Sequence, residues 1–188
     1  VKGGGHGDYK MIVLAPASVQ EMSDFVKLAF DLAFKYRNPV MILSDGMIGQ
    51  MMEKVELFDP IPRAKEFDQS WAATGKTKER DRNIIRSLFL DPLEMENHIK
   101  RLQAKYQKIV AEEIRYETHS CDDADYILIA YGSSSRICEK AYKIAREKGI
   151  KVGLLRPITL FPFPYDAIRE LSKKAKGILS VEMSEGQM

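Results

Sequence analysis

Apolar residues fall into short unbroken runs, and helical spacing follows several of these runs. Residues 11–15 and 40–43 are apolar without alternation, as expected for strands that are covered on both faces. Between them, residues that recur every three or four positions predict one apolar helix face, formed by Met22, Phe25, Ala29, Leu32, Ala33 and Tyr36. A strand, a helix and a second strand within residues 11–43 predict a βαβ unit with parallel strands.

This predicted helix carries a start and a stop signal. Ser18 and Glu21 match the S-x-x-E capping box, in which hydroxyl and carboxylate each accept a hydrogen bond from an otherwise unpaired backbone N–H. Asn38-Pro39 ends the helix, because the residue before proline is driven out of the α region. Glu21 is also a candidate catalytic carboxylate, but its spacing from Ser18 favours the capping role.

The last third of the chain repeats the pattern. Residues 126–130 predict a buried strand, and Gly132 with the serines at 133–135 predicts a turn and a helix cap. The helix is expected to run to about Lys148 and to end at Gly149.

Two further strands are predicted at 152–155 and 178–183. Between them, the proline-broken segment RPITLFPFP leads to a helix with Pro164 as its first residue and its end near Gly177. This part of the chain therefore predicts a βαβαβ arrangement.

Residues 57–117 separate the two patterns. The first stretch is polar, irregular and too long for a tight connection within one compact domain. The sequence DPLE at 91–94 is a strong helix start, and a narrow apolar stripe follows it, formed by Met95, Ile99, Leu102, Tyr106 and Ile109. We expect this helix to lie across a domain or subunit surface.

Composition and charge narrow the possible functions. Hydrophobic residues make up 45% and charged residues 30% of the 188 positions, which is ordinary for a globular protein. The 29 basic and 27 acidic side chains nearly cancel, so neither nucleic acid nor an anionic membrane is an expected partner. No apolar run approaches the roughly 18 residues of a membrane helix.

Cys121 and Cys138 form no CxxC pair, which argues against a disulfide scaffold, a zinc site or an iron–sulfur cluster in this chain. An intracellular location is expected from this cysteine usage. The chain begins at Val1 with structure predicted almost at once and stops soon after an apolar run, so we expect it to be a piece of a longer polypeptide.

Two glycine-containing motifs are weak candidates for phosphate binding. TGKT at 74–77 lacks the first glycine and the preceding strand of a P-loop. The glycines at 3–5 and Gly7 precede a strand instead of following it, so they form no dinucleotide fingerprint. Flexible backbone is the ordinary explanation for these glycines, and a solvated loop residue for the single His6 between them.

Residues at the carboxyl ends of the predicted strands are better placed, because ligands of open α/β sheets collect there. Asp45-Gly46 follows the strand at 40–43, with a turn or helix cap as the plain alternative. Arg156 and Glu182 hold similar positions. Arg156 is also suited to pair with an acid, and Glu182 to be solvated.

Several longer segments carry a resemblance to a known family. They are IVLAPASVQEM, LAFDLAFKYRNPVMILSDGMIGQMMEKVE, WAATG, RNIIRSLFLDP, AYGSSSRI, KVGLLRPITLFPFP and VEMSEGQM. In this order they resemble the alpha subunit of the 2-oxoacid:ferredoxin oxidoreductases, and within that family the 2-ketoisovalerate or branched-chain type. The match extends over essentially the whole chain.

The resemblance implies an α/β fold of two partial three-layer domains with parallel sheets. Residues 1–56 would be the C-terminal part of a pyrimidine-binding domain, 57–117 a connector with a long helix, and 118–188 a truncated transketolase C-terminal-like domain. Thiamine diphosphate with Mg²⁺ would lie between this subunit and a beta subunit that binds the pyrophosphate.

The resemblance also implies the reaction, which is oxidative decarboxylation of a 2-oxoacid to an acyl-CoA. Coenzyme A would be the co-substrate, and iron–sulfur clusters on gamma and ferredoxin-like subunits would pass electrons to ferredoxin in a cytoplasmic hetero-oligomer. The family's carboxylate at the aminopyrimidine ring would lie before Val1. Its pyrophosphate motif and cluster cysteines are absent from this sequence, so the polypeptide alone is expected to be inactive.

Within this framework, Gly5, His6, Gly7, Asp45 and Gly46 are the candidates to line the cleft for thiamine and substrate. Relatives place the loop before the APASVQE strand beside thiamine, and His6 is the side chain there that can offer an N–H to a substrate carboxylate. Two alternatives remain: a beta chain of a 2-oxoacid dehydrogenase or a transketolase-like synthase, and a non-catalytic assembly module.

Overall fold

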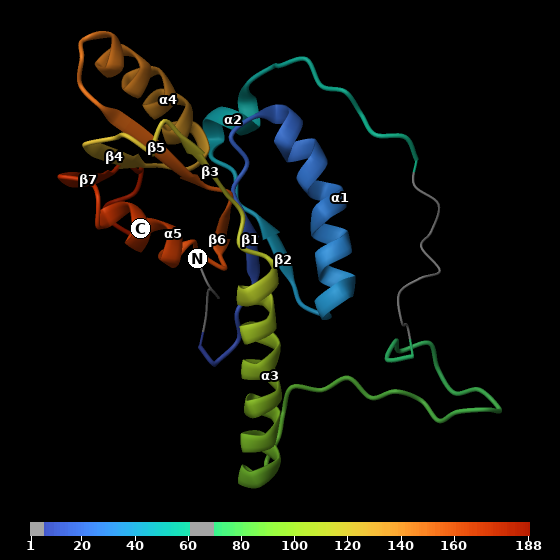
Figure 1. The fold of residues 1–188 in the computed structure, drawn as a ribbon. Helices are drawn as coiled ribbons and strands as arrows, with labels where there is room; N and C mark the ends of the chain where they lie inside the picture. The colour runs from blue at the N-terminus through green and yellow to red at the C-terminus, as the bar shows by residue number, and fades with distance from the viewer. Residues whose placement is uncertain (1–5, 61–69) are drawn as a thin grey trace.

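A computed structural model of the chain describes residues 6–60 and 70–188, and it contains two small sheets (Figure 1). The first has the strand order β2-β1-β6, formed by Val40–Ile42, Ile12–Leu14 and Thr159–Phe161. β1 and β2 are parallel, with Ile12 opposite Val40, as the predicted βαβ unit requires. β6 joins the free edge of β1 in the antiparallel direction.

The second sheet has the order β3-β5-β4-β7, formed by Tyr116–His119, Val152–Pro157, Tyr126–Ile129 and Gly177–Ser180. β5, β4 and β7 are parallel, whereas β3 pairs with β5 in the antiparallel direction. The α/β fold is therefore confirmed. Both sheets are mixed, because each gains an antiparallel edge strand that the sequence analysis did not predict.

Helices α1 (Val19–Tyr36) and α3 (Pro92–Glu112) cover the first sheet. The buried cluster joins the three residues of β1 to side chains of both helices: Phe25, Leu28, Ala29, Leu32 and Tyr36 from α1, and Leu102, Tyr106 and Ile109 from α3. The apolar face predicted for α1 is thus confirmed. α3 packs only through its C-terminal half, and its other end projects beyond the sheet (Figure 1).

The second sheet lies between α4 (Gly132–Glu147) and α5 (Tyr165–Ser172) (Figure 1). Successive residues of β4 point to opposite faces. Ile127 and Ile129 pack with the α5 side, and Leu128 packs with α4. This is a three-layer arrangement of helix, sheet and helix.

Strand β6 was missed because prolines flank it. Pro157 ends β5, Pro162 follows β6, and proline cannot donate to a sheet ladder. The chain nevertheless continues from β5 into β6, where the Thr159 N–H donates to the Arg115 carbonyl at 3.0 Å. The last third of the chain therefore completes the first sheet.

The ends of several predicted elements differ from expectation, and the strand predicted at 178–183 runs only from Gly177 to Ser180. Pro164 is the N-cap of α5 and not its first residue, and the helix stops at Ser172 instead of near Gly177. The reason lies in the next strand, since the Lys176 N–H donates to the Asp125 carbonyl and draws the chain back beside β4. The short helix α2 (Gly46–Gln50) was foreseen only as a possible cap at Asp45.

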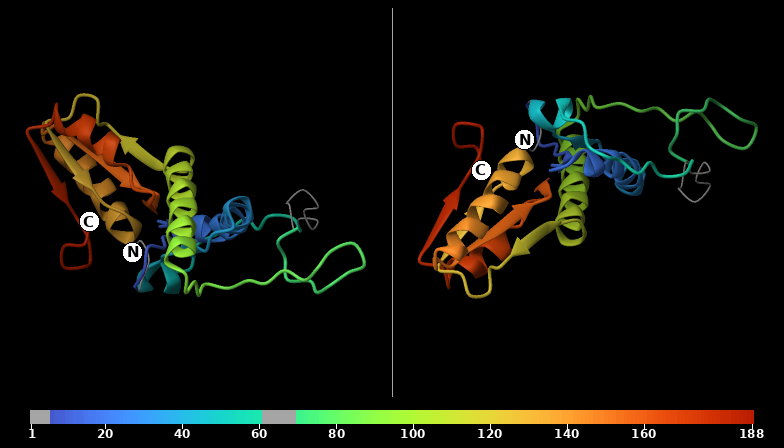
Figure 2. Two further views of the ribbon diagram at one scale, coloured as in Figure 1. Left: turned by 90° about the horizontal axis from the view of Figure 1, so that it is seen from below. Right: turned by 90° about the horizontal axis from the view of Figure 1, so that it is seen from above.

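Residues 51–60 and 70–90 belong to neither sheet, and most of them lie away from both sheets in the two views of Figure 2, whereas Glu53 pairs with Arg136 of α4 and Glu56 bonds to Gln20 of α1. They contain no helix or strand. Within the described part of the chain, no helix is both long enough and apolar enough to cross a membrane.

A polar cluster around the buried side chains of Tyr36 and Glu113 joins the end of α1 to the end of α3. The Tyr36 hydroxyl lies 2.6 Å from carboxylate oxygens of both Glu112 and Glu113, and Lys35 and Arg115 pair with Glu113 at 2.8 and 2.6 Å. Burial would raise the pKa of Glu113, but hydrogen bonds from Lys35, Tyr36 and Arg115 outweigh it and lower the pKa to about 2.

We expect this cluster to make the folded state sensitive to acid. Because the folded pKa of Glu113 is depressed, its contribution to stability is complete above its ordinary value of 4.5 and is lost as the pH falls towards 2. Thermal unfolding of the complete protein between pH 5 and 2.5 measures this loss, which amounts to up to about 3 kcal/mol. Glu113→Gln should flatten the profile, and an unchanged profile would contradict the assignment.

Candidate functional site

A pocket of about 290 Å³ opens where the carboxyl ends of several strands meet. Its lining follows β2, β4 and β7 in the chain and consists of Leu43, Ser44, Asp45, Tyr131, Gly132, Ser134, Met183 and Ser184. Parallel strands from both sheets thus direct their carboxyl ends to one place, which is where α/β proteins bind ligands. We call this the carboxyl-end pocket.

Asp45 is the polar centre of this pocket, and its carboxylate caps two helices. One oxygen accepts hydrogen bonds from the Met47 and Ile48 N–H groups of α2 at 3.0 Å each. The carboxylate also accepts from the Ser133 N–H at 3.0 Å and the Ser133 hydroxyl at 2.8 Å, at the start of α4. This side chain therefore joins α2 to α4 and contributes to the link between the two sheets.

The electrostatics agree with this capping role. Burial would raise the pKa of Asp45, but hydrogen bonds from Ile48, Ser133 and Met47 outweigh it, and the pKa is lowered overall. A negative charge at two helix N-termini is also favoured by the helix dipoles.

The start of α4 differs from the prediction that its serines form the cap. Tyr131 is the N-cap and makes no side-chain capping bond, and the serines lie inside the first turn. Gly132 has a φ of +57°, and a Cβ on it would lie 3.1 Å from an Asp45 oxygen. Glycine is needed here because it lets the Asp45 carboxylate approach the helix end.

Glu182 borders the same region and is not simply solvated. Its carboxylate accepts hydrogen bonds from the Ser184 hydroxyl at 2.7 Å and from the Gln187 and Met188 N–H groups at 3.1 Å. Burial first and the Glu182 charge second raise the pKa of Tyr131. The wall formed after β4 and β7 is therefore held by its own hydrogen bonds.

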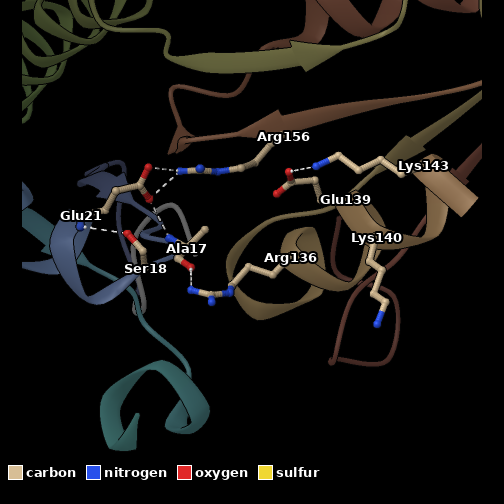
Figure 3. Close-up of a pocket in the computed structure, with 8 residues that line it drawn as sticks. All are labelled: Ala17, Ser18, Glu21, Arg136, Glu139, Lys140, Lys143 and Arg156. Carbon is tan, nitrogen blue, oxygen red and sulfur yellow. Dashed lines mark hydrogen bonds and ion pairs between the residues drawn. The ribbon is translucent and has the colours of Figure 1, made fainter. Parts of the chain in front are cut away.

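A second pocket, of about 470 Å³, lies where the two sheets join, and we call it the junction pocket (Figure 3). On one side, Arg156 of β5 reaches Glu21 of α1 with distances of 2.6 and 2.8 Å to the two carboxylate oxygens. Arg156 also donates to Glu117 at 3.1 Å. Its side chain is only 10% exposed, and its Nε makes no hydrogen bond to the described residues.

Glu21 has two structural tasks at this junction. The Glu21 N–H donates to the Ser18 hydroxyl at 3.1 Å, so the predicted cap is confirmed. The Glu21 carboxylate accepts from the Ala17 N–H at 2.7 Å and simultaneously pairs with Arg156. Of the two possibilities raised for Arg156, pairing with an acid is confirmed.

The other side of the junction pocket is one face of α4. Arg136 donates to the Ala17 carbonyl at 3.2 Å, and Lys143 pairs with Glu139 at 2.6 Å (Figure 3). Arg136 also pairs with Glu53 at 2.7 Å. Lys140 also lines the pocket. Acidic side chains already pair with most of these cations. The charged residues of the junction pocket are therefore better suited to joining the two sheets than to binding an anion.

The other predicted site residues are three from the glycine loop and Gly46 after β2. Gly5 lies outside the described residues. His6 and Gly7 are exposed and line neither pocket, and Gly7 has a φ of +104°, a value that favours glycine. Gly46 begins α2, with open space where a Cβ would lie. Asp45 is the candidate that the structure places in the carboxyl-end pocket.

Sequence reasoning missed Tyr131, Ser134 and Met183, which line the carboxyl-end pocket. The rule that selected Asp45 also applies to AYGSSS after β4, so a signal was available. Among the described residues, no group of three or more His, Cys, Asp and Glu side chains is placed to hold a metal ion.

Two family models match the chain. Pyruvate flavodoxin/ferredoxin oxidoreductase, thiamine diphosphate-binding, matches residues 5–131, and pyruvate:ferredoxin oxidoreductase core domain II matches residues 124–188. Among solved structures, a 2-oxoglutarate:ferredoxin oxidoreductase from Magnetococcus marinus, with 2-oxoglutarate, coenzyme A and succinyl-CoA bound, covers 97% of this chain. The TM-score is 0.69 at 20% identity, with 36% of that chain covered, which shows a shared fold.

Curated relatives are more similar in sequence. Ketoisovalerate oxidoreductase subunit VorB of Methanothermobacter thermautotrophicus is 51% identical over 188 residues, which is 100% of this chain and 53% of the relative. The 2-oxoglutarate synthase subunit KorA of Methanocaldococcus jannaschii is 37% identical over 206 residues, with 98% and 56% covered. The chain thus spans about half the length of the curated relatives it matches.

Proposed function

Because the chain belongs to the 2-oxoacid:ferredoxin oxidoreductase family, we propose that it forms part of a subunit that oxidatively decarboxylates a branched-chain 2-oxoacid to an acyl-CoA. The carboxyl-end pocket carries this proposal, because it lies within a chain whose residues 5–131 match a thiamine diphosphate-binding model. The higher identity to a ketoisovalerate subunit than to a 2-oxoglutarate subunit supports the branched-chain substrate.

The role of this chain in the complex would be to form one wall of the cofactor cleft. We assign residues 1–56 to the pyrimidine-binding domain, 57–117 to the connector and 118–188 to the transketolase C-terminal-like domain. Partner beta, gamma and ferredoxin-like subunits would supply Mg²⁺ binding and the iron–sulfur clusters, and the complex would act in the cytoplasm with ferredoxin and coenzyme A.

The carboxyl-end pocket fits the aromatic part of thiamine diphosphate better than its diphosphate. Leu43, Tyr131 and Met183 provide an apolar wall for a ring. The N-terminus of α4 would be the natural anion site, but the Asp45 carboxylate already fills it. This arrangement supports binding of the diphosphate by another subunit. Bound thiamine supplies an electron sink for decarboxylation.

The chain's own residues would bind and orient. Asp45 fixes the start of α4 and with it the Tyr131 side of the cleft, and the Glu21–Arg156 pair fixes the strand end that precedes α1. Gly5, Gly7 and Gly46 would let backbone approach cofactor or substrate, and His6 would donate an N–H to the substrate carboxylate.

The complete complex, supplied with thiamine diphosphate, Mg²⁺ and coenzyme A, tests the function directly. We expect it to reduce a viologen dye faster with 3-methyl-2-oxobutanoate than with 2-oxoglutarate or pyruvate. Transfer of the acyl group to a lipoyl domain without dye reduction would favour a 2-oxoacid dehydrogenase or a transketolase-like enzyme. A loaded complex without turnover of any 2-oxoacid would favour the assembly module.

His6→Ala in the complete complex is expected to raise the KM for the 2-oxoacid about tenfold or more, because a charge-assisted hydrogen bond is lost in ground and transition states alike. The turnover number should change little. Asp8→Asn is the matched control, since Asp8 is exposed in the same loop. If His6→Ala leaves both KM and turnover at the control values, His6 does not contact the substrate.

A further inference from the structure

The connection before α3 carries several aliphatic side chains that are mostly exposed to solvent. Residues 70–90, here called the arm, stand away from both sheets (Figure 2). Ile84, Ile85, Leu88 and Leu90 are between 62% and 84% exposed. Single exposed aliphatic residues are common on protein surfaces, but four within seven positions of one surface segment are not.

The arm is held in shape at its first part by its own polar side chains. Arg80 and Asn83 donate to the carbonyls of Ser70 and Ala72, and the Thr77 hydroxyl accepts from the Arg80 N–H at 3.3 Å. These bonds close residues 70–83 into one loop without burying any aliphatic residue of the arm.

Both ends of the arm are also anchored to helices. The Arg37 guanidinium at the end of α1 lies 4.3 Å from the centre of the Trp71 ring. At the other end, Phe89 stacks on His98 of α3 with ring centres 4.5 Å apart, and Arg86 pairs with Glu94 at 2.9 Å. The exposed aliphatic residues are therefore presented from a fixed frame, which lowers the entropy cost of binding.

The charge of the arm indicates what it would bind. Residues 76–86 contain five basic and two acidic side chains, although the whole chain has a net charge of only +2. Lys76 pairs with Asp81 at 3.1 Å, whereas Lys78 and Arg82 are exposed. A complementary surface has an apolar groove with acidic side chains along its edge.

A second copy of this chain is a poor match for that description. Its own apolar depression over α2 and α4, of about 440 Å³, contains Met47, Ile137 and Ile144, and the charged residues that line it are Lys140 and Arg136, the second of which already pairs with Glu53. A basic arm in that groove would meet like charges. We propose that the arm docks into an acid-edged apolar groove on a different subunit of the complex, an inference that rests on the hetero-oligomer of the proposed function.

A photo-cross-linking residue placed at position 85 of this chain, within the complete complex, identifies the subunit that the arm contacts. We expect the cross-link to join a different subunit beside acidic residues, and amide exchange of residues 84–90 to be slower in the complex than in the isolated complete subunit. A cross-link to a second copy, or exchange that is unchanged on assembly, would overturn the proposal.

A serine variant then measures the contribution of the arm. The triple change Ile84→Ser, Ile85→Ser and Leu88→Ser should weaken assembly with the partner subunits at least about 100-fold, and added salt should weaken the unmodified complex. Phe30→Ser on the exposed face of α1 is the control, because that residue is 63% exposed but outside the arm. If the triple variant assembles as well as the control variant, the arm does not dock on a partner subunit. If the unmodified complex turns over no 2-oxoacid, the proposed function is wrong instead.

Discussion

Replacing Glu21 by alanine is expected to destabilise the folded protein by about 3 kcal/mol or more, the usual cost of removing one partner from a buried ion pair. Arg156 would stay largely buried with Glu117 as its one remaining carboxylate, and the Ala17 N–H would lose its acceptor. The Nε of Arg156 already lacks a hydrogen-bond partner among the described residues, so the loss of Glu21 would leave this largely buried guanidinium with still fewer partners. Chemical unfolding of the complete protein measures the loss.

Two comparison variants show whether the buried pair is the cause. Changing Glu21 and Arg156 together to methionine should recover at least half of the loss, because no buried charge is then left unpaired, and Glu117, whose side chain is 42% exposed, stays in contact with water. Asp166→Ala breaks the exposed pair with Arg169 on α5 and should cost less than about 1 kcal/mol. A Glu21→Ala loss no larger than that of Asp166→Ala would show that the junction does not depend on this pair.

Local signals in the sequence predicted much of the fold. The Ser18 cap, the apolar face of α1, the start of α3 after Asp91 and the parallel strands all rest on spacings of a few residues, which a single sequence displays. β6 could not be predicted in the same way. Its pairing with β1 joins positions nearly 150 residues apart, and its proline neighbours hide it locally.

In the candidate site, too, local features could be predicted from the sequence and long-range contacts could not. The rule that ligands collect at strand carboxyl ends pointed to Asp45, which lines the carboxyl-end pocket. It could not reveal that Ser133, 88 residues away, also donates to that carboxylate. Glu21 is similar, since its capping role is local and its ion pair spans 135 residues. Long-range pairing gives both residues a second structural task that short-range patterns do not display.

Asp45→Ala is expected to cost about 3 kcal/mol, more than an ordinary helix cap, because it removes hydrogen bonds to two helices and leaves buried donors unpaired. Asp91→Ala is the matched control. The Asp91 carboxylate accepts a single hydrogen bond at 2.7 Å, from the Glu94 N–H at the start of α3, so its loss should cost about 1 kcal/mol. Chemical unfolding of the complete protein compares the two.

Asparagine at position 45 separates the charge from the hydrogen bonds. Its amide oxygen can accept the three bonds now made to Oδ1, from Met47, Ile48 and the Ser133 hydroxyl, but its NH₂ group would face the Ser133 N–H. Asp45→Asn should therefore cost less than Asp45→Ala. Because the folded pKa of Asp45 is lowered, its contribution is present above the ordinary value of 3.8 and is lost as the pH falls below it, so the variant should lack that acid dependence. Equal losses for Asp45→Ala and Asp91→Ala would show that the cap on α4 contributes nothing, and the two sheets would then be joined mainly by the Glu21–Arg156 pair and β6.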